Sequence, residues 1–458
     1  MRVHTVSELE KRLGIWFYAT RTAGIGGIIK QKPSDFIVRE VTNREEGDTG
    51  RFLILELKKD NWDTHSVIRE LSRRLGISRK RIGFAGTKDK FAVTTQKISI
   101  SGIEDDDLAH IRLKDVTLRI IGRSNKPVSL GDLYGNEFEI TIRGLKGSED
   151  EILQRINSIS AEIDAMGGIP NFFGVQRFGI NRPITHIVGE RLIRGDVKGA
   201  VMTYLAYITP DESESESEEV REARQLCQEG NFKECLKRMP LRYERAILNE
   251  LVKAKKSTEQ LSESDYIAAF NALPVNLQKL FIHAYQAYLF NLVLSKRMSL
   301  SLSLSLNLNM NRQQPFNTAL VGDIVCYRNE HGFADPAKLE RVTEEKVDAI
   351  NRLIKRGRAF VTAPVFGFAT ELGAGLEGEI EREVLAAEGI ELSDFKLNVL
   401  PALSSRGTRR PIIVPVKVNC KELSDDEMNP GCKRVKLNFF LPKGSYATVV
   451  LREYMKMK

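Results

Sequence analysis

The sequence contains no long apolar run. No stretch of its 458 residues approaches the roughly 20 uninterrupted apolar residues that a membrane-spanning helix needs. Residues 1–20 carry charges throughout and include no apolar segment of signal-peptide length. With 42% hydrophobic residues the chain can still bury a large core, and its length favours two or three domains. We therefore expect a globular, cytoplasmic protein with no membrane partner.

Cysteine and histidine are scarce and scattered. The five cysteines are Cys227, Cys235, Cys326, Cys420 and Cys432. They form no C-x-x-C pair, and the six histidines form no H-x-x-x-H or H-E-x-x-H pattern. The sequence therefore predicts free thiols without a disulfide framework, and no metal site.

Nucleotide-binding motifs are missing as well. Gly24 and Gly26 begin a G-x-G-x-x-G spacing, but Ile29 stands at its third position, and no Walker-type G-x-x-x-x-G-K-[ST] occurs. We expect no cofactor.

Positive charge, by contrast, is abundant and concentrated. The formal net charge is +8, and residues 65–100 contain nine Lys or Arg residues against only Glu70 and Asp89. Such a stretch favours a polyphosphate partner, although several of these side chains could equally form a solvated helix face. The candidate RNA-phosphate contacts are Arg73, Arg74, Arg79, Lys80, Arg81, Lys88 and, later in the chain, Arg177.

Strand patterns occur at both ends of the chain. Residues 52–57 are apolar at all but one position, which predicts a strand buried on both faces. Residues 116–120 and 136–143 alternate between apolar and polar, which predicts strands with one wet face. Residues 435–439 alternate in the same way.

Helix patterns accompany these strands. Residues 64–75 have an apolar side and end at Gly76, and Ser148 opens a capping-box helix. Near the end of the chain, Ser445 is the expected N-cap of a final helix. Because both ends share this mixture, we expect an α+β fold in which residues 1–190 and 405–458 build one domain.

The middle of the chain, residues 191–404, is expected to be an inserted, mostly helical α/β domain, with a strong helix at 276–297. Two low-complexity segments interrupt it. Residues 211–219 form a solvated acidic run, whereas residues 299–311 alternate with period two and could be an edge strand or a poorly ordered loop.

Asp89 stands in the segment GFAGTKDKFAVTTQKISI, in the connection between two predicted strands. The flanking Lys88 and Lys90 favour an ionised carboxylate at neutral pH, available as a nucleophile or base. A lone loop aspartate can equally be an ordinary turn residue that accepts hydrogen bonds from the backbone.

Residues 169–186 fit neither a helix nor a strand period. Phe172 and Phe173 stand there beside Asn171 and Arg177, a combination that could stack on an unpaired base and bond its edge. The alternative is that the aromatic pair closes the end of a core.

Several motifs in the same order resemble the TruD family of pseudouridine synthases, in its archaeal form. They are KPSDFIVREV, GFAGTKDKFAVT, GDLYGNEF, PNFFGVQRFG and NFFLPKGSYATVVLRE. The resemblance implies an enzyme that isomerises uridine 13 in the D arm of tRNA to pseudouridine without a cofactor or an obligate protein partner. It also implies a catalytic domain with a central antiparallel sheet, built from both chain ends, and an inserted TRUD domain.

The resemblance also assigns roles by position. Asp89 takes the place of the catalytic aspartate, and Lys30 that of a lysine beside it. Asn171 and Phe173 take the places of substrate-contacting residues, and Tyr446 that of an aromatic residue that stacks on uracil. Whether the carboxylate acts as nucleophile or base stays open.

Two other functions are compatible with the same residues. One is a non-catalytic RNA-binding or RNA-chaperone protein that uses the same basic surface. The other is a hydrolytic N-glycosidase, which would release free uracil.

Overall fold

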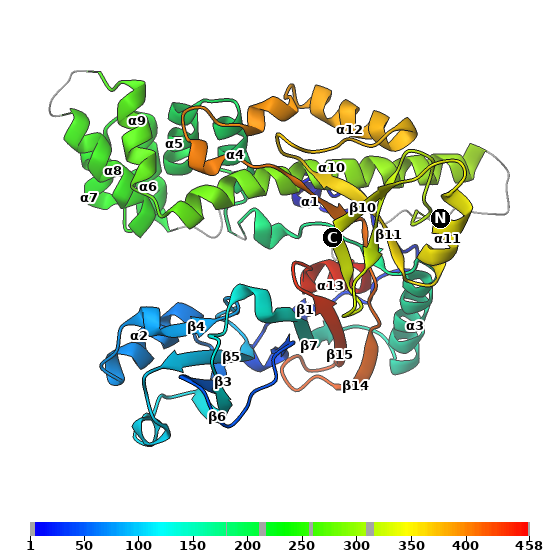
Figure 1. The fold of residues 1–458 in the computed structure, drawn as a ribbon, viewed down its shortest axis with the longest axis horizontal. Helices are drawn as coiled ribbons and strands as arrows, with labels where there is room; N and C mark the ends of the chain where they lie inside the picture. Colours follow the sequence, from blue (N-terminus) through cyan, green and yellow to red (C-terminus); the bar gives the residue numbers. More distant parts are fainter. Residues whose placement is uncertain (1–4, 180, 210–216, 256–259, 308–315, 457–458) are drawn as a thin grey trace. The chain divides into compact units, whose positions relative to one another are not determined.

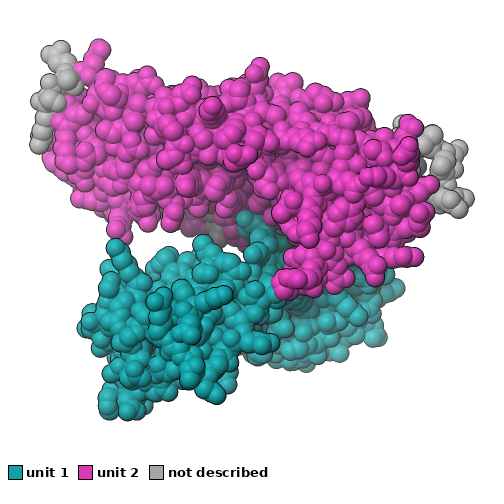
Figure 2. Space-filling view, in the orientation of Figure 1, with its two compact units in different colours: residues 1–4, 18–169, 414–458 teal, residues 5–17, 170–413 magenta. Residues whose placement is uncertain are grey.

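The computed structural model describes residues 5–179, 181–209, 217–255, 260–307 and 316–456, and for 301–307 the backbone only. Two compact units divide the chain (Figure 2). Unit 1 contains residues 18–169 and 414–458, and unit 2 contains residues 5–17 and 170–413. These boundaries differ from the predicted domain limits at 190 and 404, so the functional division into a catalytic and an inserted domain stays a prediction.

Unit 1 is built on a mixed sheet (Figure 1). Its strands are β1 (Ile28–Ile29), β2 (Phe36–Thr42), β3 (Phe52–Asp60), β4 (Ile82–Phe84), β5 (Val93–Ser101), β6 (Val116–Ser124), β7 (Leu133–Leu145), β14 (Asn419–Asp425) and β15 (Lys433–Pro442). Its helices are α2 (Thr64–Arg74), α3 (Glu149–Met166) and α13 (Ala447–Met455). The main path runs β14-β15-β7-β2-β5-β3-β6, with β1 on β7 and β4 on β5.

The register fixes which residues share a face of this sheet. Only β2 and β5 pair in parallel along the main path, so the α+β prediction is confirmed and the sheet is antiparallel except at that pair. Directly paired residues project to the same side. One such row crosses five strands through Phe439, Phe138, Val38, Thr94 and Lys59.

Two helices predicted from the sequence are confirmed in unit 1. Asp63 caps α2, which buries Val67, Ile68 and Leu71 against Leu53, Leu55 and Leu57 of β3. Full burial of such a side chain stabilises the fold by about 1.5–3 kcal/mol. Ser148 forms the predicted capping box of α3, and Gly167 ends that helix with a φ of 82°.

Two details of unit 1 differ from the sequence prediction. The wet face predicted for residues 136–143 is only partly wet, because Thr141 and Arg143 are 5% and 1% exposed. Arg143 is buried because three carboxylates satisfy its guanidinium group. The N-cap of α13 is Tyr446 rather than Ser445, whose backbone N–H instead bonds Pro442 in a turn.

Unit 2 combines helices with a four-stranded sheet of order β10-β9-β11-β12. Its helices are α1 (Glu8–Arg12), α4 (Thr185–Ile193), α5 (Val197–Ala206), α6 (Glu218–Gln228), α7 (Phe232–Arg238), α8 (Arg242–Lys255), α9 (Glu263–Asn271), α10 (Val275–Asn307), α11 (Val347–Lys355) and α12 (Gly375–Ala387). Its strands are β9 (Ile324–Arg328), β10 (Ala334–Arg341), β11 (Ala359–Val365) and β12 (Thr408–Pro411). The short strands β8 (Ile169–Pro170) and β13 (Ile413–Val414) pair separately.

Helix α10 runs through the centre of unit 2 (Figure 1). It confirms the helix predicted at 276–297. A helix with one apolar face would bury only that face, whereas nearly every residue of α10 from 284 to 295 is buried. The helix also continues through residues 299–307, so the edge strand or loop predicted there is wrong over those residues; 308–311 lie outside the described residues. Residues 211–216 lie outside them as well. In the part of the chain that the structure describes, no helix combines the length and apolar character needed to cross a membrane.

The prediction that all thiols are free is wrong for one pair. Cys227 near the end of α6 and Cys235 in α7 form a disulfide, with their Cα atoms 5.7 Å apart. A tight turn between the helices brings the two side chains together, which their separation of 8 residues does not by itself indicate. Cys326, Cys420 and Cys432 are free.

We predict that this disulfide stabilises the protein by about 2–3 kcal/mol, the value expected for closing a loop of this length. A Cys227→Ala, Cys235→Ala double variant should lose that free energy in urea unfolding under non-reducing conditions. With strong reductant present, the variant and the wild type should unfold at similar urea concentrations. A Cys420→Ala, Cys432→Ala variant is the matched control. An equal loss in both double variants would contradict the assignment.

Candidate active site

Asp89 lies in the connection between β4 and β5. Its side chain is 57% exposed, and its Oδ2 atom accepts a 2.7 Å hydrogen bond from Nζ of Lys30, a residue 59 positions away in the chain. The structure therefore brings together two of the residues singled out in the sequence. Their contact is a charge-assisted hydrogen bond between an exposed carboxylate and an ammonium group.

Lys30 has an unusual backbone conformation. Its φ of 59° lies in the left-handed region, which costs a non-glycine residue about 1–2 kcal/mol. Its ammonium group also lies 4.2 Å from the centre of the Phe36 ring. Strain of this kind persists only where the surrounding structure holds the residue in place.

A buried polar network supplies that support. The Arg143 guanidinium donates hydrogen bonds of 2.9 Å to Asp35 and 2.7 Å to Asp426. Asn429 donates a 2.8 Å bond to the side chain of Gln31, next to Lys30. Although burial alone would raise it, hydrogen bonds from Asn429, from two backbone N–H groups and from Arg143 hold the pKa of Asp426 well below its usual range. The turn between β14 and β15 is thus bonded to the segment that carries Lys30.

Lys59 of β3 lies beneath the loop that carries Asp89. This residue is 0% exposed, and its Nζ atom donates hydrogen bonds to the backbone oxygens of Asp89 at 2.8 Å, Trp62 at 2.6 Å and Lys88 at 3.4 Å. Burial lowers the pKa of Lys59 to about 8, although the carboxylates of Asp63 and Asp89 oppose the shift. A buried ammonium group therefore fixes the backbone at Asp89.

Two further buried side chains hold the same loop. The Thr64 hydroxyl accepts a 3.0 Å hydrogen bond from the backbone N–H of Lys88. The Gln96 amide donates a 3.0 Å bond to the carbonyl oxygen of Gly86. The loop is consequently anchored at several points while the Asp89 carboxylate stays exposed.

In unit 2, Asn171 is turned inward. It is 6% exposed, its side-chain N–H donates to the carbonyl oxygen of Pro411 at 2.8 Å, and its side-chain oxygen accepts from Arg410. Its backbone N–H bonds Ile412 at 2.8 Å. Both ends of the Asn171 amide are therefore engaged within unit 2.

The two neighbouring phenylalanines have different environments. Phe172 is 1% exposed, as the core-closing alternative predicts for an aromatic pair. Phe173 is half-buried, with the Arg410 guanidinium 4.2 Å from its ring centre and the Phe290 ring edge-on at 5.4 Å. The side-chain oxygen of Asn291 in α10 accepts a 2.9 Å hydrogen bond from the backbone N–H of Phe173. The side-chain N–H of Asn291 donates a 3.0 Å bond to the carbonyl oxygen of Phe173.

Comparison with known proteins decides the family. The family profile described as "tRNA pseudouridine synthase D (TruD)" matches residues 12–454. The chain belongs to the TruD family of tRNA pseudouridine synthases. It is 48% identical to "Probable tRNA pseudouridine synthase D" of Methanococcoides burtonii, over 100% of this chain and 99% of that protein. It is 41% identical to the protein of the same name from Thermococcus sibiricus, over 96% and 97% of the two chains.

A solved structure supports the same grouping. The crystal structure of a TruD protein from Methanosarcina mazei is similar to this one with a TM-score of 0.82 and 47% identity, over 99% of each chain. The α+β architecture is therefore that of the TruD family.

The positions carried over from the TruD family fall in both units. Asp89, Lys30 and Tyr446 belong to unit 1, whereas Asn171 and Phe173 belong to unit 2. Tyr446 is half-buried at the N-terminus of α13, directly after the turn that ends β15.

The candidate phosphate contacts of this TruD protein differ in exposure. Arg79 and Lys80 are exposed, and Arg73 and Arg74 are exposed beside Glu70, which bonds both. Arg81 is half-buried and donates to the carbonyl oxygen of Ser101 at 2.8 Å. Arg177, in unit 2, is half-buried, and within the described residues its Nε atom is buried without a hydrogen-bond partner.

Lys88 does not fit the phosphate-contact prediction. Its side chain is 6% exposed, and its Nζ atom forms a 2.7 Å ion pair with Glu40, whose side chain is 0% exposed. A phosphate could reach this ammonium group only if the buried pair broke, which is costly. The prediction for Lys88 is therefore corrected: its ammonium group is the buried partner of Glu40 and supports the loop.

Sequence reasoning missed three residues that hold candidate residues in place, Lys59 within unit 1 and Asn291 and Arg410 within unit 2. Lys59 is part of a two-lysine strand end, Asn291 lies inside an apolar helix, and Arg410 stands in a run of two arginines. Each acts through contacts with segments far away in the chain. One signal was available for Lys59. In a strand it shares a face with Leu57 and Leu55, which indicates that its side chain points into the core.

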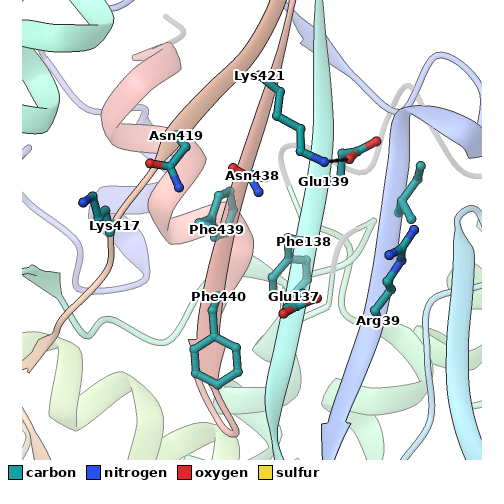
Figure 3. A pocket seen from close by; sticks show the side chains of 11 residues that line it. Arg39, Glu137, Phe138, Glu139, Lys417, Asn419, Lys421, Asn438, Phe439 and Phe440 are labelled. Carbon is teal, nitrogen blue, oxygen red and sulfur yellow. Dashed lines mark hydrogen bonds and ion pairs between the residues drawn. The ribbon is translucent and has the colours of Figure 1, made fainter.

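Figure 3 shows a pocket on the unit 1 sheet. Its lining residues include Arg39, Glu137, Glu139, Lys421 and Asn438, with a 2.6 Å ion pair between Lys421 and Glu139. In β7, Glu137 and Glu139 flank Phe138 and project away from the row that contains Lys59. Phe138 and Phe439 of that row also line the pocket, but none of its lining residues belongs to the loop that carries Asp89.

We predict that Lys80 and Lys88 respond differently to loss of their charge. Lys80→Met should reduce the slope of log affinity for tRNA against log salt by about 1, because an exposed phosphate contact is lost. Lys88→Met should leave the slope unchanged but lower the free energy of unfolding by about 3 kcal/mol, because Glu40 stays buried without its partner. Salt titrations of tRNA binding and urea unfolding measure both effects. The assignment is wrong if folded Lys88→Met shows the smaller slope.

Proposed function

We propose that this TruD protein isomerises uridine 13 in the D arm of tRNA to pseudouridine, with Asp89 as the single catalytic carboxylate and no cofactor. The observation that carries the proposal is the exposed Asp89 carboxylate. It is paired with Lys30, and it projects from a loop that buried side chains anchor. The proposal also places the protein in the cytoplasm. It further assigns both chain ends to the catalytic domain and residues 191–404 to the inserted TRUD domain.

The proposed reaction breaks the bond between N1 of uracil and C1′ of ribose. The base then turns, C5 bonds to C1′, the C5 proton leaves and N1 gains a proton. Asp89 acts either as the nucleophile at C1′ or as the base at C2′. Both roles need a carboxylate that can reach the ribose, and the exposed side chain of Asp89 on a fixed backbone meets that need.

Lys30 has two roles in this proposal. Its ammonium group orients the Asp89 carboxylate through their 2.7 Å contact. The same positive charge stabilises the negative charge that develops on the departing uracil. Neither role requires a metal ion or a nucleotide.

Phe173 and Tyr446 are proposed to stack on the extruded nucleotide. The part proposed for Asn171 is to order its loop, because both ends of its amide are bonded within unit 2. The exposed Arg73, Arg74, Arg79 and Lys80 would contact phosphates and position the tRNA.

Replacement of Asp89 by asparagine should abolish the reaction without preventing binding. We expect Asp89→Asn to release tritium from [5-³H]uridine-labelled tRNA transcript at least about 1000-fold more slowly than wild type, because the amide can act neither as nucleophile nor as base. Its affinity for tRNA should stay within about threefold. Asp106→Asn, which changes an exposed carboxylate outside this loop, should behave like wild type.

The competing functions give other results in this assay. Full activity in Asp89→Asn would rule out the catalytic assignment. Binding of tRNA with no tritium release by wild type would favour a non-catalytic RNA-binding protein. Free uracil in the supernatant would identify a hydrolytic N-glycosidase.

The position of the modified uridine can be tested separately. A tRNA transcript in which uridine 13 is replaced by cytidine should release no tritium above background. Carbodiimide treatment and primer extension should place the pseudouridine of the unaltered transcript at position 13. A primer-extension stop at another position would retain the activity but overturn the proposed specificity.

A further inference from the structure

Lys59 is a buried charge that stability alone does not explain. Its residue is 0% exposed, although lysine is almost never fully buried unless it is paired. Burial of an ammonium group costs free energy, and the lowered pKa of about 8 reflects that cost. A methionine side chain of similar length would fill the same space without the desolvation.

The contacts of Lys59 are directed at the loop of Asp89. Two of its three hydrogen bonds reach the carbonyl oxygens of Lys88 and Asp89, at 3.4 and 2.8 Å. The third, of 2.6 Å to Trp62, ties the same ammonium group to the turn after β3. Lys58, the preceding residue, is exposed and makes none of these contacts.

We propose that Lys59 is a positioning residue, which fixes the backbone of Lys88 and Asp89 and thereby places the Asp89 carboxylate against the target ribose. This inference rests on the proposed function of Asp89. Lys59 does not touch the substrate, because its side chain is buried beneath the loop. Its ammonium group supplies a buried donor to both carbonyl oxygens, which buried backbone groups need, and the Thr64 hydroxyl reaches that of Lys88 as well, at 3.4 Å.

The physical reason is the sensitivity of the reaction to the position of the carboxylate. Asp89 projects from a loop, so the backbone at residue 89 determines where its carboxylate lies. A misplacement of about 1 Å between reacting groups can cost about 100-fold in rate. A positioning residue should therefore change the rate of the chemical step and leave tRNA affinity nearly unchanged.

The test compares Lys59→Met with Lys58→Met, which removes the neighbouring exposed charge. Wild-type tritium release is measured first, and its absence would remove the proposed function itself. With an active wild type, the single-turnover rate of Lys59→Met at saturating enzyme should fall about 100-fold. Its Kd for tRNA and its far-ultraviolet circular dichroism should stay close to wild type, and Lys58→Met should match wild type throughout.

A rate within threefold of wild type in folded Lys59→Met would overturn the inference, as would equal losses in rate and affinity. If Lys59→Met does not fold, Thr64→Val decides the question, since it removes only the hydroxyl that bonds Lys88 at the same loop. We expect about a tenfold slower single turnover with an unchanged Kd, the usual effect of one lost positioning bond. An unchanged rate in Thr64→Val would then reject the positioning of this loop as a determinant of the reaction.

Discussion

The hydrogen bonds between the buried ammonium group of Lys59 and the backbone of residues 88 and 89 are the contact on which the candidate site depends. The position of Lys59 follows from the register of its strand. Lys59 stands two residues after Leu57 and four after Leu55 in β3, so it shares a face with these core residues beneath α2. A slip of one residue in β3 would turn this side chain to the other face and leave the loop carbonyls without their donor. The register of β3 in the sheet therefore also determines the geometry of the loop that carries Asp89.

A second set of buried contacts holds the segment of Lys30, the residue paired with the same carboxylate. The contact between Asp89 and Lys30 involves a mostly exposed carboxylate, and such pairs contribute only about 0–1 kcal/mol by themselves. It cannot hold Lys30 in a left-handed conformation. The buried bonds of Arg143 to Asp35 and Asp426 can, because breaking a buried ion pair costs about 3–5 kcal/mol. Each partner of the weak exposed pair is thus fixed by strong buried contacts of its own.

The sequence allowed local features to be predicted and missed long-range ones. The capping box at Ser148 and the loop position of Asp89 depend on neighbouring residues, and the structure has both. The period-two pattern at 299–307 misled because α10 already extends from a buried segment, and adding residues to a helix is easier than starting a strand. Residue type does not distinguish Lys59 from Lys58, because two of the three hydrogen-bond partners of Lys59 lie 29 and 30 positions away.

Asn171 is linked to Phe173 through Arg410. Its amide is bonded to Pro411 and Arg410, and the same Arg410 guanidinium lies against the ring of Phe173. One arginine therefore orders the motif and covers one part of its aromatic side chain. A base that stacks on Phe173 must use a part of the ring that Arg410 leaves open, or displace the guanidinium. Removal of Asn171 would then act on stacking indirectly, through the position of Arg410.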